Sequence, residues 1–320
     1  MKVCVLADEV FGDYSPEPYL QNHEWKMYNV QRPALDFIRD ILARESHDVF
    51  LNLCDGMADE DRPGLDVVQA LETLGVPFTG PDSGFYSPSR DQMQAVAHEI
   101  GIGFARGMTV TKGEDIQQAV KRAGYRYPLM VKHYESYGSV GMTRDSRVEN
   151  SDQLQVQFDA LCANFGGARV EEFIEGREFT VLIVDNPDDL SQPYLHQPLE
   201  IIFPAGETFK HWKLKFDDDV DMDLETVTEP VLAARLKDMV EKMYLALGGT
   251  SYGRADVRMD ADGNLYMLEL NPGPSILNST VEMTSADFMV VEDPDGADGF
   301  LDRIFRSALI RFHSKVVLVS

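Results

Sequence analysis

The chain has 320 residues, of which 44% are hydrophobic and 26% are charged. This length and composition are ordinary for a globular protein with two or three domains. The formal net charge of -25 argues against a sequence-independent grip on phosphates, as nucleic-acid binding or anionic membrane binding would require. We therefore expect neither nucleic acid nor membrane as a partner.

The N-terminal segment MKVCVLADEV lacks a basic region followed by a long apolar core, which favours a first β-strand over a signal peptide. No stretch approaches the roughly eighteen apolar residues of a membrane span. Cys4, Cys54 and Cys162 are far apart and show no CxxC spacing, which disfavours a disulfide framework or a zinc site. A reducing cytoplasm is the expected compartment.

The first part of the chain alternates strand and helix patterns. Strands are predicted at 3–6, 49–53 and 76–79, and helices at 33–43 and 65–74. Such alternation predicts βαβ units and an open parallel sheet. Ligands of open parallel sheets gather at the carboxyl ends of the strands. Asp8, Glu9 and the loop 54–64 are therefore candidates for substrate contact, with merely exposed acidic loops as an equal alternative.

The stretch 87–89 predicts a domain boundary, and the helical spacing of apolar residues at 93–100 predicts that a helix opens the next domain. A strand at 127–132 then ends in Lys132. The loop 137–142 that follows contains two glycines, which allow backbone amides to approach a phosphate closely. An ordinary hairpin turn is the alternative for that loop.

Further along, the acidic run 170–177 leads into a strand at 178–184, and by itself it is typical of a strand entry. Lysines alternate with bulky residues at 208–216, which predicts a strand with Lys213 and Lys215 on one face, opposite Trp212 and Phe216. The alternative is the charged outer face of an edge strand. The acidic run 217–223 lacks the EF-hand pattern and is expected to be a solvated loop or lid. Amphipathic helices are predicted at 229–247, with Val231 on the apolar face, and at 300–312.

The most informative stretch is 252–274, in which turn-forming residues at 260–264 separate two apolar runs and predict a β-hairpin. Pairing Asp260 with Leu265 places Asp256 opposite Glu269, and Arg254 opposite Asn271. Side chains alternate across a strand with period two, so these four polar groups, and Met267 with them, are expected on one face. Oxygen ligands of this kind suit Mg²⁺. A solvated polar face is the alternative, although the neighbouring leucines indicate a buried strand.

The blocks Arg254-Ala255-Asp256 and Tyr266-Met267-Leu268-Glu269-Leu270-Asn271-Pro272 resemble the magnesium-binding block of ATP-grasp ligases, most closely the D-alanine–D-alanine ligase branch. The resemblance implies an α/β (α+β) protein of three domains, expected at 1–88, 89–178 and 179–320. It implies ATP as cofactor with two Mg²⁺ ions, Mn²⁺ being an alternative. Asp256, Glu269 and Asn271 would hold the metals, and Arg254 would support the reacting carboxylate.

The resemblance extends to the nucleotide. Lys132 and Lys215 match the lysines that reach the phosphates, and the loop with Ser139 matches the phosphate-covering loop. Glu171 matches the acid facing the adenine amino group, and Glu178 matches the acid that binds the ribose. Backbone groups near Glu172, Phe173 and Ile174 would read the adenine edge.

The resemblance breaks at several positions. Gln92 stands where the family has a second phosphate-binding lysine, and the nearby Arg90 is expected to point elsewhere. Gly138, the loop 54–64 and the segment 272–276 replace the family's D-alanine contacts. We therefore expect a ligase that joins a carboxylate to an amine through an acyl phosphate, releasing ADP and phosphate. Its substrates are expected to be small amino acids or carboxylates other than D-alanine, and a homodimer is allowed. The alternative is a nucleotide-binding protein that has lost or changed its ligase activity.

Overall fold

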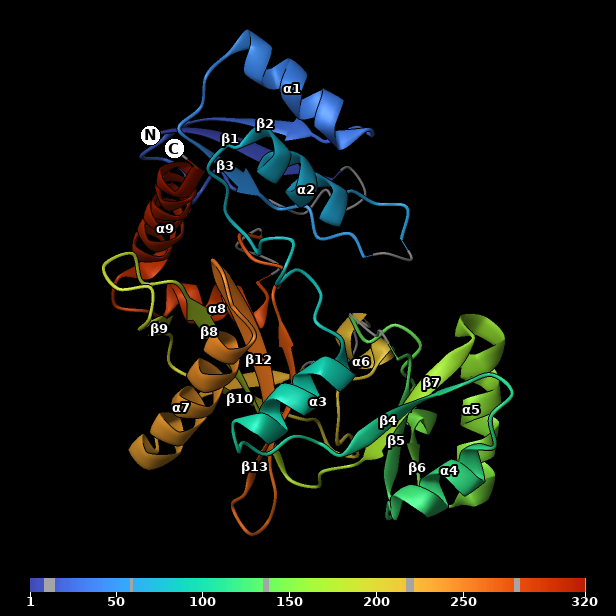
Figure 1. Ribbon diagram of the computed structural model, residues 1–320. Coiled ribbons are helices and arrows are strands. Elements are labelled where there is room, and N and C mark those ends of the chain that lie inside the picture. The colour runs from blue at the N-terminus through green and yellow to red at the C-terminus, as the bar shows by residue number, and fades with distance from the viewer. Residues whose placement is uncertain (9–14, 58–59, 135–137, 217–221, 279–282, 320) are drawn as a thin grey trace.

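The computed structural model contains three β-sheets with helices packed on them (Figure 1). It describes residues 1–8, 15–57, 60–134, 138–216, 222–278 and 283–319. Glu9, residues 58–59 of the candidate substrate loop, Tyr137 and residues 217–221 of the acidic run lie outside this range. In the part of the chain that is described, no helix is long and apolar enough to cross a membrane.

The N-terminal sheet is parallel, with strand order β2 (Glu24–Asn29), β1 (Lys2–Ala7), β3 (Val49–Asn52). Helices α1 (Ala34–Arg44) and α2 (Leu65–Leu74) pack on it through an apolar cluster that includes Leu6, Ile38 and Leu71. These elements confirm the predicted open parallel sheet. The sequence reading missed β2, an edge strand with mostly exposed residues and no apolar alternation. The strand predicted at 76–79 forms only one bridge, between Phe78 and Phe50.

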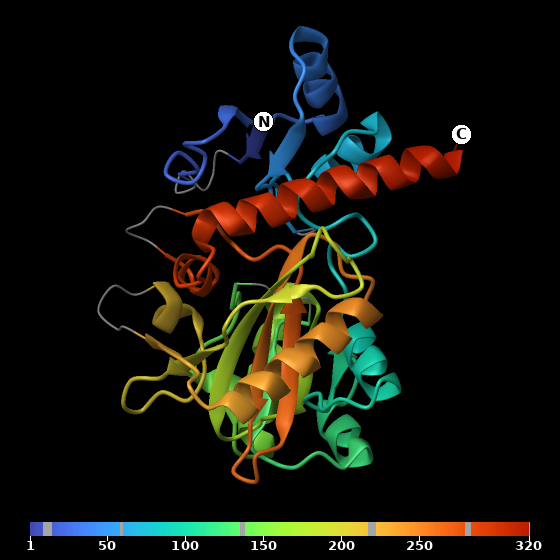
Figure 2. The ribbon, with the colours of Figure 1, turned by 90° about the vertical axis from the view of Figure 1, so that its left-hand side faces the viewer.

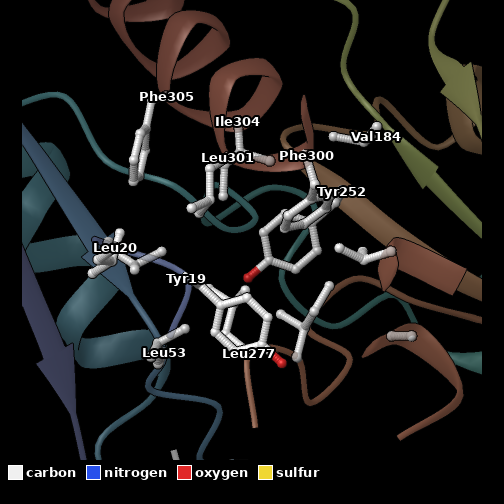
Figure 3. Packing of buried hydrophobic residues seen from close by; sticks show 14 of the residues in the cluster. Tyr19, Leu20, Leu53, Val184, Tyr252, Leu277, Phe300, Leu301, Ile304 and Phe305 are labelled. Carbon is white, nitrogen blue, oxygen red and sulfur yellow. The ribbon is translucent and has the colours of Figure 1, made fainter. Parts of the chain in front are cut away.

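The last helix, α9 (Gly296–Val319), crosses between the N-terminal sheet and the large sheet (Figure 2). Its residues Phe300, Leu301, Ile304 and Phe305 lie in one buried cluster with side chains of both sheets, together with α8 (Ser285–Val291) (Figure 3). The predicted helix at 300–312 is therefore confirmed and is longer at both ends. Burial of these apolar side chains stabilises the contact between the N-terminal sheet and the C-terminal helix.

The middle sheet is antiparallel, with strand order β4 (Gly107–Thr111), β7 (Gly167–Glu172), β5 (Leu129–Lys132), β6 (Arg147–Val148). A short 3-10 turn, η1 (Arg144–Ser146), precedes β6. Helices α4 (Ile116–Ala123) and α5 (Ser151–Phe165) share an apolar cluster with this sheet. The predicted strand at 127–132 corresponds to β5, and Lys132 is its last residue.

The large sheet has the order β11 (Asp223–Thr226), β10 (Leu199–Ile202), β8 (Arg177–Val184), β12 (Tyr252–Met259), β13 (Leu265–Asn271), and β9 (Tyr194–Leu195) also pairs with β8. Helices α3 (Arg90–Glu99) and α7 (Pro230–Ala246) share a buried cluster with one of its faces. Helix α7 confirms the prediction for 229–247, except that Val231 is 74% exposed. At the amino end of the helix, the apolar pattern of the sequence begins one residue before the first buried side chain, Leu232. The domain bounds at 88 and 178 stay a proposal.

The hairpin β12–β13 has the predicted register at the polar residues, with Asp256 opposite Glu269 and Arg254 opposite Asn271. Its turn is different, because Met259 rather than Asp260 pairs with Leu265, and the register shifts between Asp256 and Val257. One strand thus has an extra residue, which is a β-bulge. The bulge reverses the alternation, so Met267 packs in the α7 cluster. The prediction that Met267 shares a face with Glu269 is therefore wrong.

The strand predicted at 208–216 is also wrong, because residues Trp212–Phe216 form the short helix α6. Trp212 and Phe216 stack across one turn of this helix, with ring centroids 4.3 Å apart. Lys213 is exposed whereas Lys215 is half-buried, so the two lysines do not share a face. A spacing of two residues places side chains on different sides of a helix.

Candidate ATP and metal site

The acidic end of the candidate site lies on β12 and β13. Asp256 is buried, with 5% of the residue exposed, and Arg254 Nε lies 3.6 Å from the Oδ1 atom of its carboxylate. Asn271 is half-buried, and its Oδ1 accepts a hydrogen bond from the Gly273 amide at 3.1 Å. A carboxamide oxygen has a second lone pair available for a further partner. The two carboxylates and the carboxamide are therefore gathered as predicted, and their role as metal ligands stays a prediction.

A lysine that the sequence reading did not single out lies beside this acid. Lys210 Nζ is 3.0 Å from Asp256 Oδ2 and 3.0 Å from Glu178 Oε1. Burial opposes the charge on Lys210, but Asp256 and Glu178 outweigh it and raise the pKa of the lysine. Although burial acts to raise the pKa of Asp256, Lys210 and Arg254 hold it well below its usual range. The Asp256 carboxylate therefore stabilises the charged form of Lys210, and Lys210 and Arg254 stabilise the charged form of Asp256.

Arg90 is the second functional residue that the sequence reading misplaced. It is the first residue of α3, it is 9% exposed, and its guanidinium is paired with Glu269. The expectation that Arg90 points elsewhere is therefore wrong. Gln92, by contrast, is exposed, and its backbone amide is capped by Ser89 Oγ at 3.1 Å. At this end of α3 the cation of the site is thus Arg90.

Lys132 and Glu171 form a buried pair on the adjacent strands β5 and β7. The other oxygen of Glu171 accepts from Arg169 Nε at 2.9 Å, and Arg169 is fully buried. Burial acts to raise the pKa of Glu171, yet Lys132 and Arg169 lower it overall. Lys132 and Glu171 therefore lie together, on the strand edges that face the large sheet.

The predicted adenine hinge connects β7 to β8, from Glu172 through Phe173 and Ile174. The Glu172 amide donates to the Arg106 carbonyl at 2.8 Å, and the Phe173 amide donates to the Pro128 carbonyl at 3.1 Å. The Ile174 carbonyl accepts from Arg258 at 2.7 Å. These bonds hold the hinge in a defined shape, so groups that read a base edge would be preorganised.

Arg258 connects this hinge to the ribose candidate. Its Nε lies 2.9 Å from Glu178 Oε2, and its guanidinium stacks on Phe173 with 4.6 Å to the ring centroid. The Glu178 carboxylate thus has Arg258 on one oxygen and Lys210 on the other. Arg258 and Lys210, which the sequence did not single out, thus connect the hinge to Glu178 and Asp256. With Glu269 opposite Asp256, these residues form one row from the hinge to Glu269.

The candidate phosphate loop contacts the segment that carries Lys210. Gly138, Ser139 and Gly141 have φ angles of 55°, 61° and 72°, the left-handed region that glycine adopts most readily. Ser139 Oγ lies 3.5 Å from the Lys210 carbonyl, and the Trp212 amide donates to the Met142 carbonyl at 3.1 Å. The loop therefore lies over the row of charged residues, where the resemblance places a phosphate-covering loop.

Lys215 has an unusual pKa. Burial first, and then the like charges of Lys210 and Arg254, lower the pKa of its ammonium group to about 8. A polyphosphate bound beside it would stabilise the charged form and raise this pKa.

We therefore expect ATP binding at pH 8 to take up about half a proton, because about half of the Lys215 side chains are then neutral. At pH 6.5 the part of the uptake that Lys215 contributes should be close to zero, so the wild type and Lys215→Gln should differ little there. Calorimetry in buffers with different ionisation enthalpies measures it, and Lys215→Gln should abolish it. Equal uptake by that variant would contradict the placement of Lys215 at the phosphates.

An open pocket adjoins the far end of the row. Its wall joins the carboxyl end of β3 to the segment after β13. Its lining residues are Asn52, Leu53, Cys54, Asp55, Met57, Pro81, Tyr86, Tyr252, Asn271, Gly273, Pro274 and Ile276. Asn271 thus belongs both to the candidate metal ligands and to the pocket wall.

The candidate substrate loop is held by Arg62 at the rim of the N-terminal sheet. Arg62 lies 2.7 Å from Asp8, 2.6 Å from Asp55 and 3.2 Å from Glu60. Three carboxylates on one guanidinium leave this cluster with excess negative charge. Burial raises the pKa of Asp55 even though Arg62 opposes this.

The donor set fits Mg²⁺ rather than a zinc-type metal. No cluster of three or more His, Cys, Asp or Glu side chains suited to a metal occurs among the described residues. Two carboxylates with one carboxamide match an ion that is usually held by one or two carboxylates together with substrate phosphates. Lys210, Arg254 and Arg90 neutralise these carboxylates in the described structure.

The family model described as "D-ala D-ala ligase C-terminus" matches residues 96–287, which contain most of this row. The chain belongs to the D-alanine–D-alanine ligase family. This family membership confirms an ATP-dependent carbon–nitrogen ligase of the ATP-grasp fold. The N-terminal substrate loop lies outside the match.

Individual members of the D-alanine–D-alanine ligase family are similar over most of the chain. The D-alanine–D-alanine ligase of Geobacter sulfurreducens is 28% identical over 85% of this chain and 80% of its own length. That of Cupriavidus necator is 24% identical over 88% of this chain and 81% of its own length.

Solved structures show the same fold. The ATP-complexed D-alanine–D-alanine ligase of Bacillus anthracis superposes with a TM-score of 0.74 at 20% identity, covering 98% of this chain and 99% of that one. The VanG D-Ala:D-Ser ligase of Enterococcus faecalis superposes with a TM-score of 0.71 at 16% identity, covering 96% and 99%.

Proposed function

We propose that this protein joins a carboxylate to an amine at the expense of ATP and Mg²⁺, and that its substrates differ from a pair of D-alanines. One observation supports this most directly: Asn271 is shared between the predicted metal ligands and the wall of the adjoining pocket. When bound, ATP with Mg²⁺ would supply a phosphoryl group that converts the substrate carboxylate to an electrophilic acyl phosphate and leaves ADP. The amine would then attack the acyl carbon and displace phosphate.

The protein's own residues position and neutralise charge. Glu171 and the hinge 172–174 orient the base, and Glu178 binds the ribose. Lys132, Lys215 and the Ser139 loop hold the phosphates, while Asp256, Glu269 and Asn271 hold the metal. Arg254 stabilises the acyl phosphate or the oxyanion that forms when the amine attacks it. Fixed charges of this kind act without reorganisation at the moment of reaction.

The lining of the pocket supports an amino acid with an apolar side chain as a substrate. Met57, Tyr86, Pro274 and Ile276 contribute apolar surface, and Asp55 is the carboxylate in its wall. Such a wall suits an ammonium group next to an apolar side chain. One structural neighbour is a D-Ala:D-Ser ligase, so the fold is not confined to joining two D-alanines.

A phosphate-release screen with pairs of amino acids and small carboxylic acids tests the proposal. We expect release with at least one pair that includes an amino acid with an apolar side chain, and at least about tenfold less with D-alanine alone, because a missing apolar contact costs about 1–3 kcal/mol. Efficient turnover of D-alanine alone would contradict the substrate proposal. Tight ATP binding without release for any pair would favour the alternative, a nucleotide-binding protein without ligation.

Several expectations stay predictions. These are the number of metal ions, the use of Mn²⁺, the homodimer and the cytoplasmic location. The three cysteines are all free and buried, which is compatible with a reducing compartment.

A further inference from the structure

We propose that Lys210 is a phosphate-binding residue, and that its ammonium group marks the path of the α- and β-phosphates between the ribose and the metal. This inference rests on the proposed function, because it takes Glu178 as the ribose ligand and Asp256 as a metal ligand. It adds a residue that the sequence motifs do not identify.

The position of the ammonium group is the first observation. Lys210 Nζ lies 3.0 Å from a carboxylate oxygen of Glu178 and 3.0 Å from one of Asp256. The ribose and the metal-bound phosphates of a nucleotide are connected through the α-phosphate. Lys210 lies between Glu178, the proposed ribose ligand, and Asp256, the proposed metal ligand. Its ammonium group is therefore beside the α- and β-phosphates.

The local charge is the second observation. Glu178 already has Arg258 on its other oxygen, and Asp256 has Arg254 nearby. A divalent cation bound to Asp256 would repel the Lys210 ammonium group and take its place at the carboxylate. The N–H donors of Lys210 would then be available to the phosphate oxygens, with which they form strong charge-assisted hydrogen bonds.

The backbone at Lys210 is held in place, so this exchange needs only a side-chain movement. Leu214 donates from its amide to His211 Nδ1 at 3.3 Å, and His211 Nε2 lies 3.0 Å from Glu207. Arg144 pairs with the same Glu207. The bonds from Ser139 Oγ to the Lys210 carbonyl and from the Trp212 amide to the Met142 carbonyl hold this segment against the phosphate loop, which keeps the lysine side chain within reach.

Calorimetry with ADP, AMP and adenosine tests the proposal in the presence of Mg²⁺. In Lys210→Met we expect ADP to bind about tenfold to a hundredfold more weakly, as is typical for a lost charged hydrogen bond, and adenosine to bind within about twofold of the wild type. Lys210→Arg should restore most of the ADP affinity. The matched control, Lys242→Met, removes an exposed lysine of α7 and should change neither affinity.

A second measurement uses no nucleotide. Lys210 and Mg²⁺ compete for Asp256 in this scheme, so Lys210→Gln should bind Mg²⁺ alone more tightly than the wild type does. Lys210→Gln also provides the ADP-to-adenosine ratio if the methionine variant does not fold. Unchanged ADP affinity, or equal losses for ADP and adenosine, would overturn the proposal. A wild type that binds no ADP would instead contradict the proposed function itself.

Discussion

Glu269→Gln is expected to lower substrate-dependent ADP release by at least about a hundredfold, whichever substrate pair the screen identifies. Glutamine keeps the size of the side chain but removes the negative charge that a metal ion requires. Losing one fixed charge at the transferring group typically costs this much in rate. The variant also removes the Glu269 carboxylate from its ion pair with Arg90. A coupled assay for ADP at saturating substrate measures the effect.

The control for this variant is Glu200→Gln. Glu200 lies on β10 of the same sheet and is also paired with an arginine, Arg177. Glu200 lies directly opposite Phe179 on the neighbouring strand, so the two side chains are on the same face of the sheet. Phe179 belongs to the cluster under α7, so Glu200 faces away from the site. The Glu200→Gln variant should release ADP at a rate within about twofold of the wild type. Full turnover by Glu269→Gln would remove the basis for the metal assignment.

The second large effect is expected on stability. Arg169→Met should lower the free energy of unfolding by about 3–5 kcal/mol, because it removes a fully buried cation, one of the two that pair with the buried Glu171 carboxylate, and leaves Lys132 to neutralise Glu171 alone. Arg169 is fully buried and contacts Glu171 at 2.9 Å, Asp91 at 2.6 Å and Gln94 at 2.8 Å. It therefore connects helix α3 to the strand that carries Glu171. Urea denaturation monitored by fluorescence measures the change.

Arg306→Met provides the matched control. Arg306 is also an arginine with two carboxylate partners, Asp188 and Asp302, but its side chain is 45% exposed. Exposed ion pairs contribute little, so the variant is expected to unfold at nearly the same urea concentration as the wild type. If the two variants lost the same stability, burial of the Arg169 cluster would not be the cause.

The position of Arg169 also has a consequence for the nucleotide. An added Cβ at Gly107 would lie 2.8 Å from Arg169 and 2.7 Å from the Glu171 side chain. Because glycine has no Cβ, Gly107 allows Arg169 and Glu171 to pack against its backbone. Since Lys132 depends on Glu171 for its position, the cluster that supports the fold of the middle sheet also orients the phosphate lysine.

The sequence by itself predicted the pairing of Asp256 with Glu269 and of Arg254 with Asn271. The predicted turn register was one residue off, and the bulge next to Asp256 restores the predicted pairing at the polar residues. The sequence supplied the alternation along each strand, which is a local property with period two. It also predicted the helices α1, α2 and α7, whose apolar spacing is equally local, and the motifs on which the family resemblance rests.

Only the tertiary structure decided which cations face these acids. Arg90 and Glu269 are separated by 179 residues, and Lys210 and Asp256 by 46, so no local pattern connects them. Helix α6 was mistaken for a strand because alternating lysines satisfy the period of a strand, whereas its helical form depends on contacts with the phosphate loop. The bulge that separates Met267 from Glu269 is likewise set by packing, because the core requires the methionine on one face and the site requires the acid on the other.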